Sequence, residues 1–374
     1  MKNILIISNF FYPELTPRAF RVHELIKEFT KLGHKVTLVL PNKEIYHNNK
    51  VNIEGLNIIY SNSKKIIDGS NKNPLDIIIH NNKIRFFIMK IGKFFFPKEI
   101  FLTYDSGITN VFKSINNEFD ILISISQPLS IHLSVIFGLL SNKKLRKTPV
   151  KYAEFSDPLF SGNYFNVFPF YLLLGYLFSA YFNYFSIPTR NSLDYFSRFK
   201  SKSNIKIIPQ GFDFNNVKLD KYKLNKVITF AYAGSFYESL RNPHYFFKHL
   251  ESLDIKFKFI IYTNSFYIKE MVKDNFPNLK QKIIFKEFIK RENLISELAS
   301  MDFLVNFDNE NSLMVPSKLI DYALTKRPIL SFSSKTFKVT SFDRFMNGDY
   351  SDRIMIDIEL FNIKNITNKF LNAC

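Results

Sequence analysis

Cysteine is almost absent from this sequence, and its absence excludes two kinds of structure. Only one of the 374 residues is a cysteine, Cys374. A disulfide within the chain and a zinc site built from cysteines both need more than one such residue. The composition is therefore typical of a protein that works in a reducing compartment.

Acidic residues are scarce beside basic ones. The chain has 51 lysines and arginines against 33 aspartates and glutamates, which gives a net charge of +18. This charge favours an acidic partner, either a nucleic acid, an anionic bilayer or a phosphorylated substrate. No helix-turn-helix, zinc-finger or RRM pattern occurs, and the basic residues are spread along the chain. We therefore expect no nucleic-acid partner and keep a basic nucleic-acid-binding protein only as an alternative.

Long apolar runs are also few. The first run, Ile4 to Ile7, is too short for a signal peptide, so we expect no export. Residues 158–189 contain no Asp, Glu, Lys, Arg or His, but Asn163 and Asn166 interrupt them. This pattern favours a buried or interfacial helix with an exposed aromatic face over a transmembrane span. At 85–98, a basic and aromatic patch leaves bilayer contact and a core helix with a solvated lysine edge both open.

Hydrophobic residues make up 46% of the chain, which is enough for two packed cores. Near the N-terminus, buried runs at 4–7 and 36–40 flank a stretch at 22–32 with helical apolar spacing, which Gly33 ends. This order predicts a strand, a helix and a second strand. The loop at 9–18 follows the first strand, and open α/β sheets bind ligands at the carboxyl ends of their strands.

The alternation of strand and helix continues and predicts the fold class: α/β, with two doubly wound Rossmann-like domains facing across a cleft. We expect an N-terminal domain over 1–213, a polar linker over 214–225 and a C-terminal domain over 226–374. No short-period repeat occurs. Further strands are expected at 121–126, 151–155, 205–208, 227–233, 256–262, 282–285, 302–307 and 328–332.

Two loops of the second domain are candidates for phosphate binding, and the first follows the strand at 227–233. That strand ends in Gly234 and Ser235, where glycine permits a close approach of the backbone to a ligand. Arg241 follows in the same loop and could give a bidentate phosphate contact. A single glycine after a strand is also compatible with a simple turn.

The second loop leads into a short helix that Ser317 opens as a predicted N-cap. The free N–H groups of a helix start, together with Lys318, can hold a diphosphate. Asp321 lies one turn on, where a carboxylate can accept two hydrogen bonds from a ribose diol. The alternative for this local pattern is a carboxylate that interacts with the helix dipole and binds no ligand.

Several short stretches carry a resemblance through their order and spacing along the chain. Together they make the chain similar to the retaining, nucleotide-sugar-dependent glycosyltransferases of the GT-B fold. Within these enzymes it resembles the family 4-like group that builds bacterial surface polysaccharides. The matching stretches are Tyr12-Pro-Glu-Leu-Thr-Pro-Arg-Ala-Phe-Arg, Gly33-His-Lys-Val-Thr, Ser124-Ile-Ser-Gln-Pro, Glu154-Phe-Ser-Asp-Pro, Ile208-Pro-Gln-Gly-Phe-Asp, Tyr232-Ala-Gly-Ser and Val315-Pro-Ser-Lys-Leu-Ile-Asp-Tyr.

The resemblance makes the C-terminal domain the donor domain and the N-terminal domain the acceptor side. It implies that Gly234, Ser235 and Arg241 hold the donor diphosphate, with help from the helix N-terminus at Ser317 and from Lys318. No Asp-x-Asp triplet occurs at a strand end, so a metal-bridged diphosphate is not suggested. We expect no cofactor and no metal, because positive charge and helix dipoles can stabilise the leaving diphosphate.

Other roles follow from the resemblance by position. Thr16 and Arg18 are expected near the phosphates or the transferred sugar, and Asp157 beside the reacting sugar carbon. Asp321 takes the place of the second glutamate in the family's Glu-x7-Glu pattern, on the donor ribose. The first glutamate would fall at position 313, which is Leu313 here; the nearest polar candidates are Glu310 and Asn311.

The function that the resemblance implies is transfer of a sugar from a nucleotide-diphosphate sugar to a polyprenyl-linked or saccharide acceptor. The basic charge then favours a peripheral, cytoplasmic location at the anionic surface of the inner membrane. Two alternatives remain besides a nucleic-acid-binding protein. A nucleotide-sugar 2-epimerase uses the same double fold, and a non-catalytic GT-B scaffold is suggested by Leu313.

Overall fold

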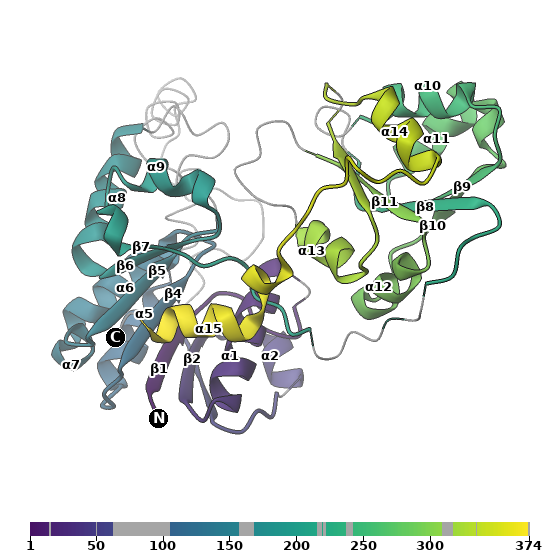
Figure 1. The fold of residues 1–374 in the computed structure, drawn as a ribbon. Coiled ribbons are helices and arrows are strands. Elements are labelled where there is room, and N and C mark those ends of the chain that lie inside the picture. Colours follow the sequence, from purple (N-terminus) through teal and green to yellow (C-terminus); the bar gives the residue numbers. More distant parts are fainter. Residues whose placement is uncertain are drawn as a thin grey trace, which may run out of the picture. The chain divides into compact units, whose positions relative to one another are not determined.

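The computed structural model divides the chain into two compact units, which we describe separately. Unit 1 comprises Met1–Phe212 with Asn362–Cys374, and unit 2 comprises Asp213–Phe361. Both are parallel α/β structures (Figure 1). The structure describes the chain except residues 15, 50, 63–104, 157–167, 215–218, 220–221, 237–241, 309–316, 334 and 373–374, and except the side chains of 168–170 and 317.

The described part of unit 1 contains a parallel sheet of seven strands in the order β3-β2-β1-β4-β5-β6-β7. The apolar runs predicted as strands fall in this sheet, because a parallel strand is covered on both faces and its residues are buried on both. Ile4 to Ile7, for example, are wholly buried in β1. The strands are β1 (Asn3–Ile7), β2 (Lys35–Pro41), β3 (Leu56–Ser61), β4 (Ile121–Ile125), β5 (Val150–Glu154), β6 (Tyr184–Ile187) and β7 (Ile205–Ile207).

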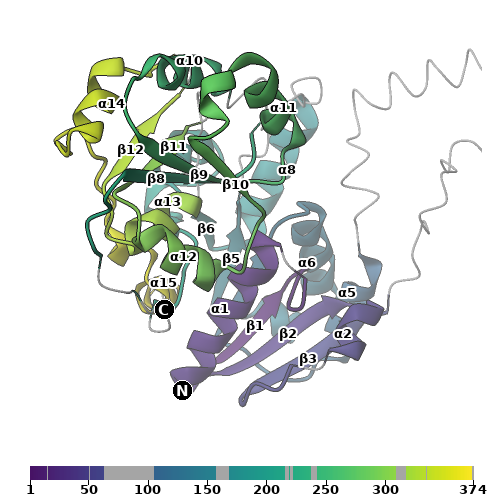
Figure 2. The ribbon, with the colours of Figure 1, turned by 90° about the vertical axis from the view of Figure 1, so that its right-hand side faces the viewer.

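Helices cover both faces of this sheet (Figure 2). On one face α1 and α15 pack against alternate strand residues such as Ile4 and Ile6. On the other face α5, α6 and α8 pack against the residues between them, such as Leu5 and Ile7. The α-helices in the described part of unit 1 are α1 (Pro17–Lys31), α2 (Glu44–Asn48), α5 (Ser106–Ser114), α6 (Ser130–Ser141), α7 (Lys143–Arg146), α8 (Phe168–Tyr181), α9 (Leu193–Phe196) and α15 (Ile363–Leu371).

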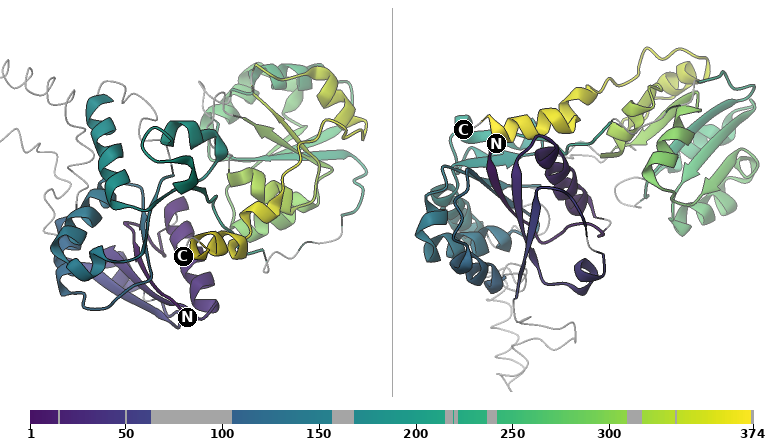
Figure 3. Two further views of the ribbon diagram at one scale, coloured as in Figure 1. Left: turned by 60° about the vertical axis from the view of Figure 1, so that its left-hand side comes forward. Right: turned by 90° about the horizontal axis from the view of Figure 1, so that it is seen from below.

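The last helix corrects the predicted domain boundaries. We expected the second domain to run to residue 374, but α15 belongs to unit 1 and lies beside α1 (Figure 3). The physical reason is an apolar stripe on α15: Phe370 packs against Phe29 of α1, with ring centroids 6.4 Å apart. The hydroxyl of Tyr152 in β5 also donates to the carbonyl oxygen of Phe370 at 3.3 Å.

The predicted linker differs from the structure in a similar way. Unit 2 begins at Asp213, and the described end of the expected linker packs on unit 2. Asn225 Nδ2 donates to Asp302 Oδ1 at 3.1 Å, and the Tyr222 hydroxyl donates to the same carboxylate oxygen. These residues are therefore part of the unit and not a spacer.

The described part of unit 2 contains a parallel sheet of five strands in the order β10-β9-β8-β11-β12. Helices α10, α11 and α14 cover one face and α12 and α13 the other, where Leu298 and Tyr322 are buried (Figure 1). The elements are β8 (Ile228–Ala233), β9 (Phe257–Tyr262), β10 (Ile283–Lys286), β11 (Phe303–Phe307), β12 (Ile329–Phe332), α10 (His244–Ser252), α11 (Phe266–Asn275), α12 (Arg291–Ala299), α13 (Ser317–Leu324) and α14 (Val339–Met346).

Stacked phenylalanines fill the first of these two layers. Phe230 in β8 lies between Phe259 and Phe303 on the neighbouring strands, with ring centroids 4.6 and 4.8 Å away. Such aromatic pairs contribute about 0.5–1.5 kcal/mol each beyond their buried area. The abundant phenylalanine of this chain thus builds a core in unit 2.

The apolar segment at 158–189 contributes α8 and β6. In the described residues α8 has 14 residues, and no described helix is long and apolar enough to cross a bilayer. One side of α8 is buried through Tyr171, Leu174 and Phe178, while Leu173 and Tyr176 are mostly exposed. The patch at 85–98 lies outside the described residues.

A histidine is buried in the core of unit 1. His132 of α6 is inaccessible to solvent, and its Nδ1 lies 2.7 Å from the hydroxyl of Ser124. The rings of Phe155, Phe178 and Phe182 surround it at 4.9 to 5.6 Å. Burial lowers the pKa of His132 to about 3, because the charged form would lose its hydration.

This burial predicts an acid-sensitive fold. Below pH 6.5 the unfolded chain binds a proton at His132, whereas the folded chain binds it only near pH 3. The free energy of unfolding therefore falls as the pH drops from about 6.5 toward 3. Between pH 7 and pH 5 the loss is about 2 kcal/mol of unfolding free energy. The pKa values of His23 and His34 are also lowered, so His132→Gln keeps their share of the acid sensitivity. Urea unfolding should therefore show a loss in His132→Gln that is smaller than the wild-type loss by about 2 kcal/mol. His47→Gln removes an exposed histidine of the same unit and should keep the wild-type loss. Equal losses in all three proteins would contradict the assignment.

Candidate functional site

The turn after β8 requires glycine. Gly234 has a φ of +150°, a conformation that side-chain-bearing residues rarely adopt. A Cβ added there would lie 2.9 Å from the hydroxyl oxygen of Tyr232 and 3.6 Å from Nζ of Lys318. Because β8 is the central strand at which the order of the sheet reverses, this turn occupies the edge where such sheets bind ligands.

Two tyrosines hold this turn in place. The Tyr232 hydroxyl donates to the Ser235 carbonyl oxygen at 3.0 Å, and the Tyr322 hydroxyl accepts from the Ala233 N–H at 2.6 Å. Lys318 Nζ lies 4.3 Å from the centre of the Tyr232 ring, within cation–π distance. The structure therefore brings three predicted donor-site residues together: Gly234, Ser235 and Lys318.

Helix α13 begins at Ser317, the residue predicted to open it. The first N–H groups of a helix have no partner within the helix, and the helix dipole adds partial positive charge there. Lys318 adds a full positive charge in the same turn and is half-buried. The turn at Gly234 and Ser235 and the start of α13 with Lys318 form one corner of unit 2, which is thus suited to an anion. The Ser317 side chain is outside the description.

Asp321 has a partner that the sequence did not reveal. Arg291, the first residue of α12, donates from Nε at 2.8 Å and places Nη2 2.6 Å from the same oxygen, Oδ1. Burial raises the pKa of the Asp321 carboxyl, while the charge of Arg291 lowers it. A ribose contact at Asp321 would therefore be made by a carboxylate that Arg291 orients. In the sequence Arg291 reads only as one basic residue at a helix start.

The Arg291–Asp321 pair should contribute to stability because it is only partly exposed, at 31% and 18%. A double-mutant cycle with Arg291→Ala and Asp321→Ala is expected to give a coupling of about 1 kcal/mol in unfolding free energy. The Lys202–Asp194 pair, exposed at 62% and 89%, is the matched control and should show no measurable coupling. Equal coupling in both cycles would contradict a special role for burial.

In unit 1, Thr16 caps the helix that follows β1. Its Oγ1 accepts from the N–H of Ala19 at 3.1 Å, and Pro17 occupies the first helical position. This is a typical N-cap, in which a side-chain oxygen satisfies an unpaired amide. The geometry gives Thr16 a structural role, and its predicted role near the donor remains a prediction.

Arg18 lies beside a buried ion pair. Glu154, at the carboxyl end of β5, is 2% exposed; its Oε1 lies 2.9 Å from Nε of Arg21 and 3.6 Å from Nη1 of Arg18. The guanidinium of Arg21 also donates to the carbonyl oxygens of Pro209, at 2.6 Å, and Ile208, at 3.1 Å. Burial lowers the pKa of Arg21, and Glu154 opposes that shift.

This cluster gives a structural role to Glu154, the first residue of the predicted stretch Glu154-Phe-Ser-Asp-Pro. The sequence identified Glu154 only as part of a motif, and its role is to fix Arg18 and Arg21 at the carboxyl edge of the sheet. Oε2 of Glu154 has no hydrogen-bond partner among the described residues. Arg18 itself remains 24% exposed, so its guanidinium can meet a ligand at this edge. The remaining predicted residues lie outside the described residues: Asp157, Arg241, Glu310, Asn311 and Leu313.

The sequence matches no protein-family model and no curated protein. Solved structures do match in three dimensions over nearly the whole chain. HepE from Anabaena, solved with UDP and glucose, is 10% identical with a TM-score of 0.57, covering 100% of this chain and 99% of that one. The lipopolysaccharide outer core galactosyltransferase WaaB is 13% identical with a TM-score of 0.59, covering 99% and 98%.

This chain has the GT-B fold. A third similar structure, a proposed UDP-N-acetylglucosamine 2-epimerase from Listeria monocytogenes, is 11% identical with a TM-score of 0.56, covering 99% of this chain and 95% of that one. Transferases and an epimerase candidate thus share the architecture, and identities this low establish the fold alone. The predicted fold class of two Rossmann-like domains is confirmed.

Proposed function

We propose that this protein is a glycosyltransferase that moves a sugar, with retention, from a nucleotide-diphosphate sugar to a lipid-linked or saccharide acceptor. The acceptor would be an intermediate of bacterial surface polysaccharide synthesis. The observation that carries the proposal is the meeting of Gly234 with Lys318 at the start of α13. These are residues to which the resemblance assigns the donor diphosphate.

The chemistry that this corner supports is departure of a nucleoside diphosphate. As the bond to the sugar breaks, negative charge builds up on the diphosphate, and Lys318 with the α13 dipole stabilises it. Asp321 lies on the same helix and is oriented by Arg291, and we assign it to the donor ribose as the resemblance implies. In this proposal the positive charges come from the chain itself and no metal or cofactor takes part.

Unit 1 would supply the acceptor side. Arg18, held by Glu154, and Asp157 are the proposed catalytic residues, with Asp157 beside the reacting carbon as the resemblance implies. The excess of basic residues supports attraction to the anionic inner leaflet, where a polyprenyl-linked acceptor would be found. We propose a peripheral, cytoplasmic location on that ground.

The epimerase alternative has its own supporting observation, which is the fold likeness to the Listeria protein. The two activities differ in what they require. An epimerase changes UDP-N-acetylglucosamine without any acceptor, whereas a transferase leaves the donor sugar's configuration at C2 unchanged and needs an acceptor. Incubation with the nucleotide sugar alone, followed by NMR of the sugar, separates them.

The donor site predicts selective nucleotide binding. We expect one of UDP, GDP, CDP, TDP and ADP to raise the melting temperature more than the others, equally with and without magnesium. Loss of the Lys318 charge in Lys318→Gln should weaken that nucleotide about 10- to 100-fold, because charge-assisted hydrogen bonds contribute about 1.5–3 kcal/mol.

Lys273→Gln is the control for net charge, since Lys273 is an exposed residue of α11 in the same unit. It should leave the affinity unchanged. Identical nucleotide affinity in wild type and Lys318→Gln would remove the donor site from this corner. The absence of any nucleotide binding would favour the non-catalytic scaffold.

A further inference from the structure

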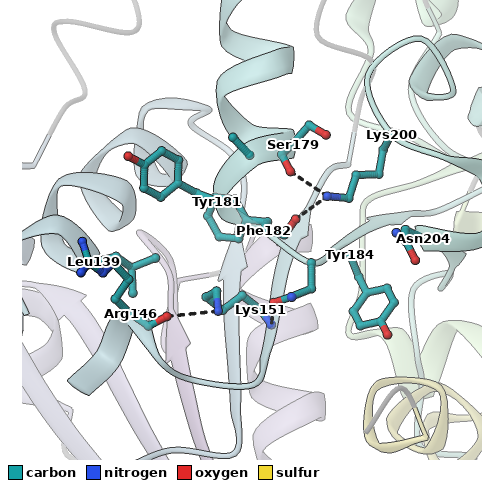
Figure 4. Close-up of a pocket in the computed structure, with 11 residues that line it drawn as sticks. Leu139, Arg146, Lys151, Ser179, Tyr181, Phe182, Tyr184, Lys200 and Asn204 are labelled. Atoms are coloured by element: carbon teal, nitrogen blue, oxygen red, sulfur yellow. Dashed lines mark hydrogen bonds between the residues drawn. The ribbon is translucent and has the colours of Figure 1, made fainter. Parts of the chain in front are cut away.

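A polar pocket opens in unit 1 at the end of the sheet opposite to Arg18 and Glu154. It has a volume of about 480 Å³. Lys151 and Tyr184, which line it, stand at the starts of β5 and β6, and Asn204 directly precedes β7. The pocket therefore lies at the amino ends of the strands, whereas Glu154 lies at the carboxyl end of β5. Figure 4 shows its lining.

The pocket is basic. Arg146, Lys151 and Lys200 line it, and no described aspartate or glutamate does. Lys143 and Lys144 of α7, and Lys147 after it, add positive charge close by in the chain. Three cations around one cavity without a carboxylate repel one another, so an anion between them would lower the electrostatic energy.

The two lysines are fixed in place. Lys200 Nζ donates to the carbonyl oxygens of Ser179, at 2.7 Å, and Phe182, at 2.6 Å, as Figure 4 shows. Lys151 Nζ donates to those of Thr148, at 2.5 Å, and Arg146, at 3.3 Å. An ammonium group has three N–H donors, so each lysine retains one beyond these bonds. A ligand would then meet ordered donors and would not have to immobilise two long side chains.

Arg146 supplies the third donor group. Its side chain is exposed, and its guanidinium makes no hydrogen bond or ion pair within the described part of the chain. Burial lowers the pKa of both Lys151 and Lys200. A bound anion would raise both values again, because it would favour the charged ammonium.

We propose that this pocket binds a phosphate group, held by Arg146, Lys151 and Lys200, at a site separate from the proposed donor site. Planar guanidinium and ammonium groups around a polar cavity are typical of phosphate recognition. The phosphate can belong to a soluble phosphate monoester or to the headgroup of an anionic lipid.

One feature of the surface makes the lipid source worth testing. Leu173, Tyr176 and Ala180 follow at spacings of three and four residues along α8, so they share one face of the helix. Leu173 is 64% and Tyr176 57% exposed, and Ala180 lines the pocket. An apolar stripe thus runs to the basic pocket, as a headgroup site with adjoining acyl chains would require.

Calorimetry with inorganic phosphate and glycerol 3-phosphate tests the soluble source, and sedimentation with vesicles tests the lipid source. The vesicles contain phosphatidylcholine with or without phosphatidylglycerol. We expect binding in at least one arm, and Arg146→Gln should weaken it about tenfold while leaving the melting temperature unchanged. Lys147→Gln makes the same charge change on an exposed neighbour that does not line the pocket, and it should change the affinity less than twofold.

Lys318→Gln, in unit 2, should leave phosphate or vesicle binding intact, which separates this pocket from the donor site. Conversely, Arg146→Gln should bind nucleotide as the wild type does, so a wild type that binds phosphate or vesicles but no nucleotide would contradict the proposed function alone. Equal weakening by Arg146→Gln and Lys147→Gln would reduce the effect to general surface charge and overturn the proposal. The absence of wild-type binding in both arms would also overturn it and would leave the two lysines as caps of helix ends.

Discussion

The close approach of the backbone at Gly234 is the constraint on which the candidate site depends. At this residue the chain leaves β8 with a φ that favours glycine, and a Cβ there would clash with the Tyr232 hydroxyl and touch Lys318 Nζ. The Lys318 ammonium also lies within cation–π distance of the Tyr232 ring. A cation and a helix start therefore meet at the central strand of the sheet. That arrangement suits a diphosphate better than a neutral ligand.

In unit 1 the end of β5 is held in place by a buried ion pair between Glu154 and Arg21. Glu154 is buried at the end of β5 and is compensated by Arg21 and, at longer range, by Arg18. Removing one partner of such a pair leaves an uncompensated buried charge, so the cluster fixes the local structure. Because Arg21 also binds two carbonyl oxygens after β7, it ties α1 to the far strands of the sheet. Arg18 is the member of the cluster that reaches the surface.

Much of the fold was predictable because a parallel strand that is buried on both faces appears in the sequence as an apolar run. The runs Ile121–Ile125 and Phe303–Phe307 are buried throughout and read as apolar segments with one polar residue each, Ser124 and Asn306. The packing of α15 on unit 1 was not predictable in this way, because the apolar face of a helix does not show which surface it will pack against. Part of the donor corner was also predictable, because a glycine after a strand and a helix start have local signals.

The ion pairs between residues far apart in the sequence had no local signal. Arg291 lies 30 residues before Asp321, and Arg21 lies 133 residues before Glu154. Only tertiary packing brings these pairs together. The basic pocket was missed for the same reason, because Arg146, Lys151 and Lys200 come from separate elements and each alone reads as a solvated residue.

The most direct test of the account is a crystal structure of the protein with its preferred nucleoside diphosphate bound. We predict that the diphosphate oxygens lie within hydrogen-bond distance of Lys318 Nζ and in van der Waals contact with the backbone at Gly234 and Ser235. A nucleotide bound elsewhere, with the Lys318 ammonium still resting on the Tyr232 ring and no phosphate beside it, would contradict the central claim.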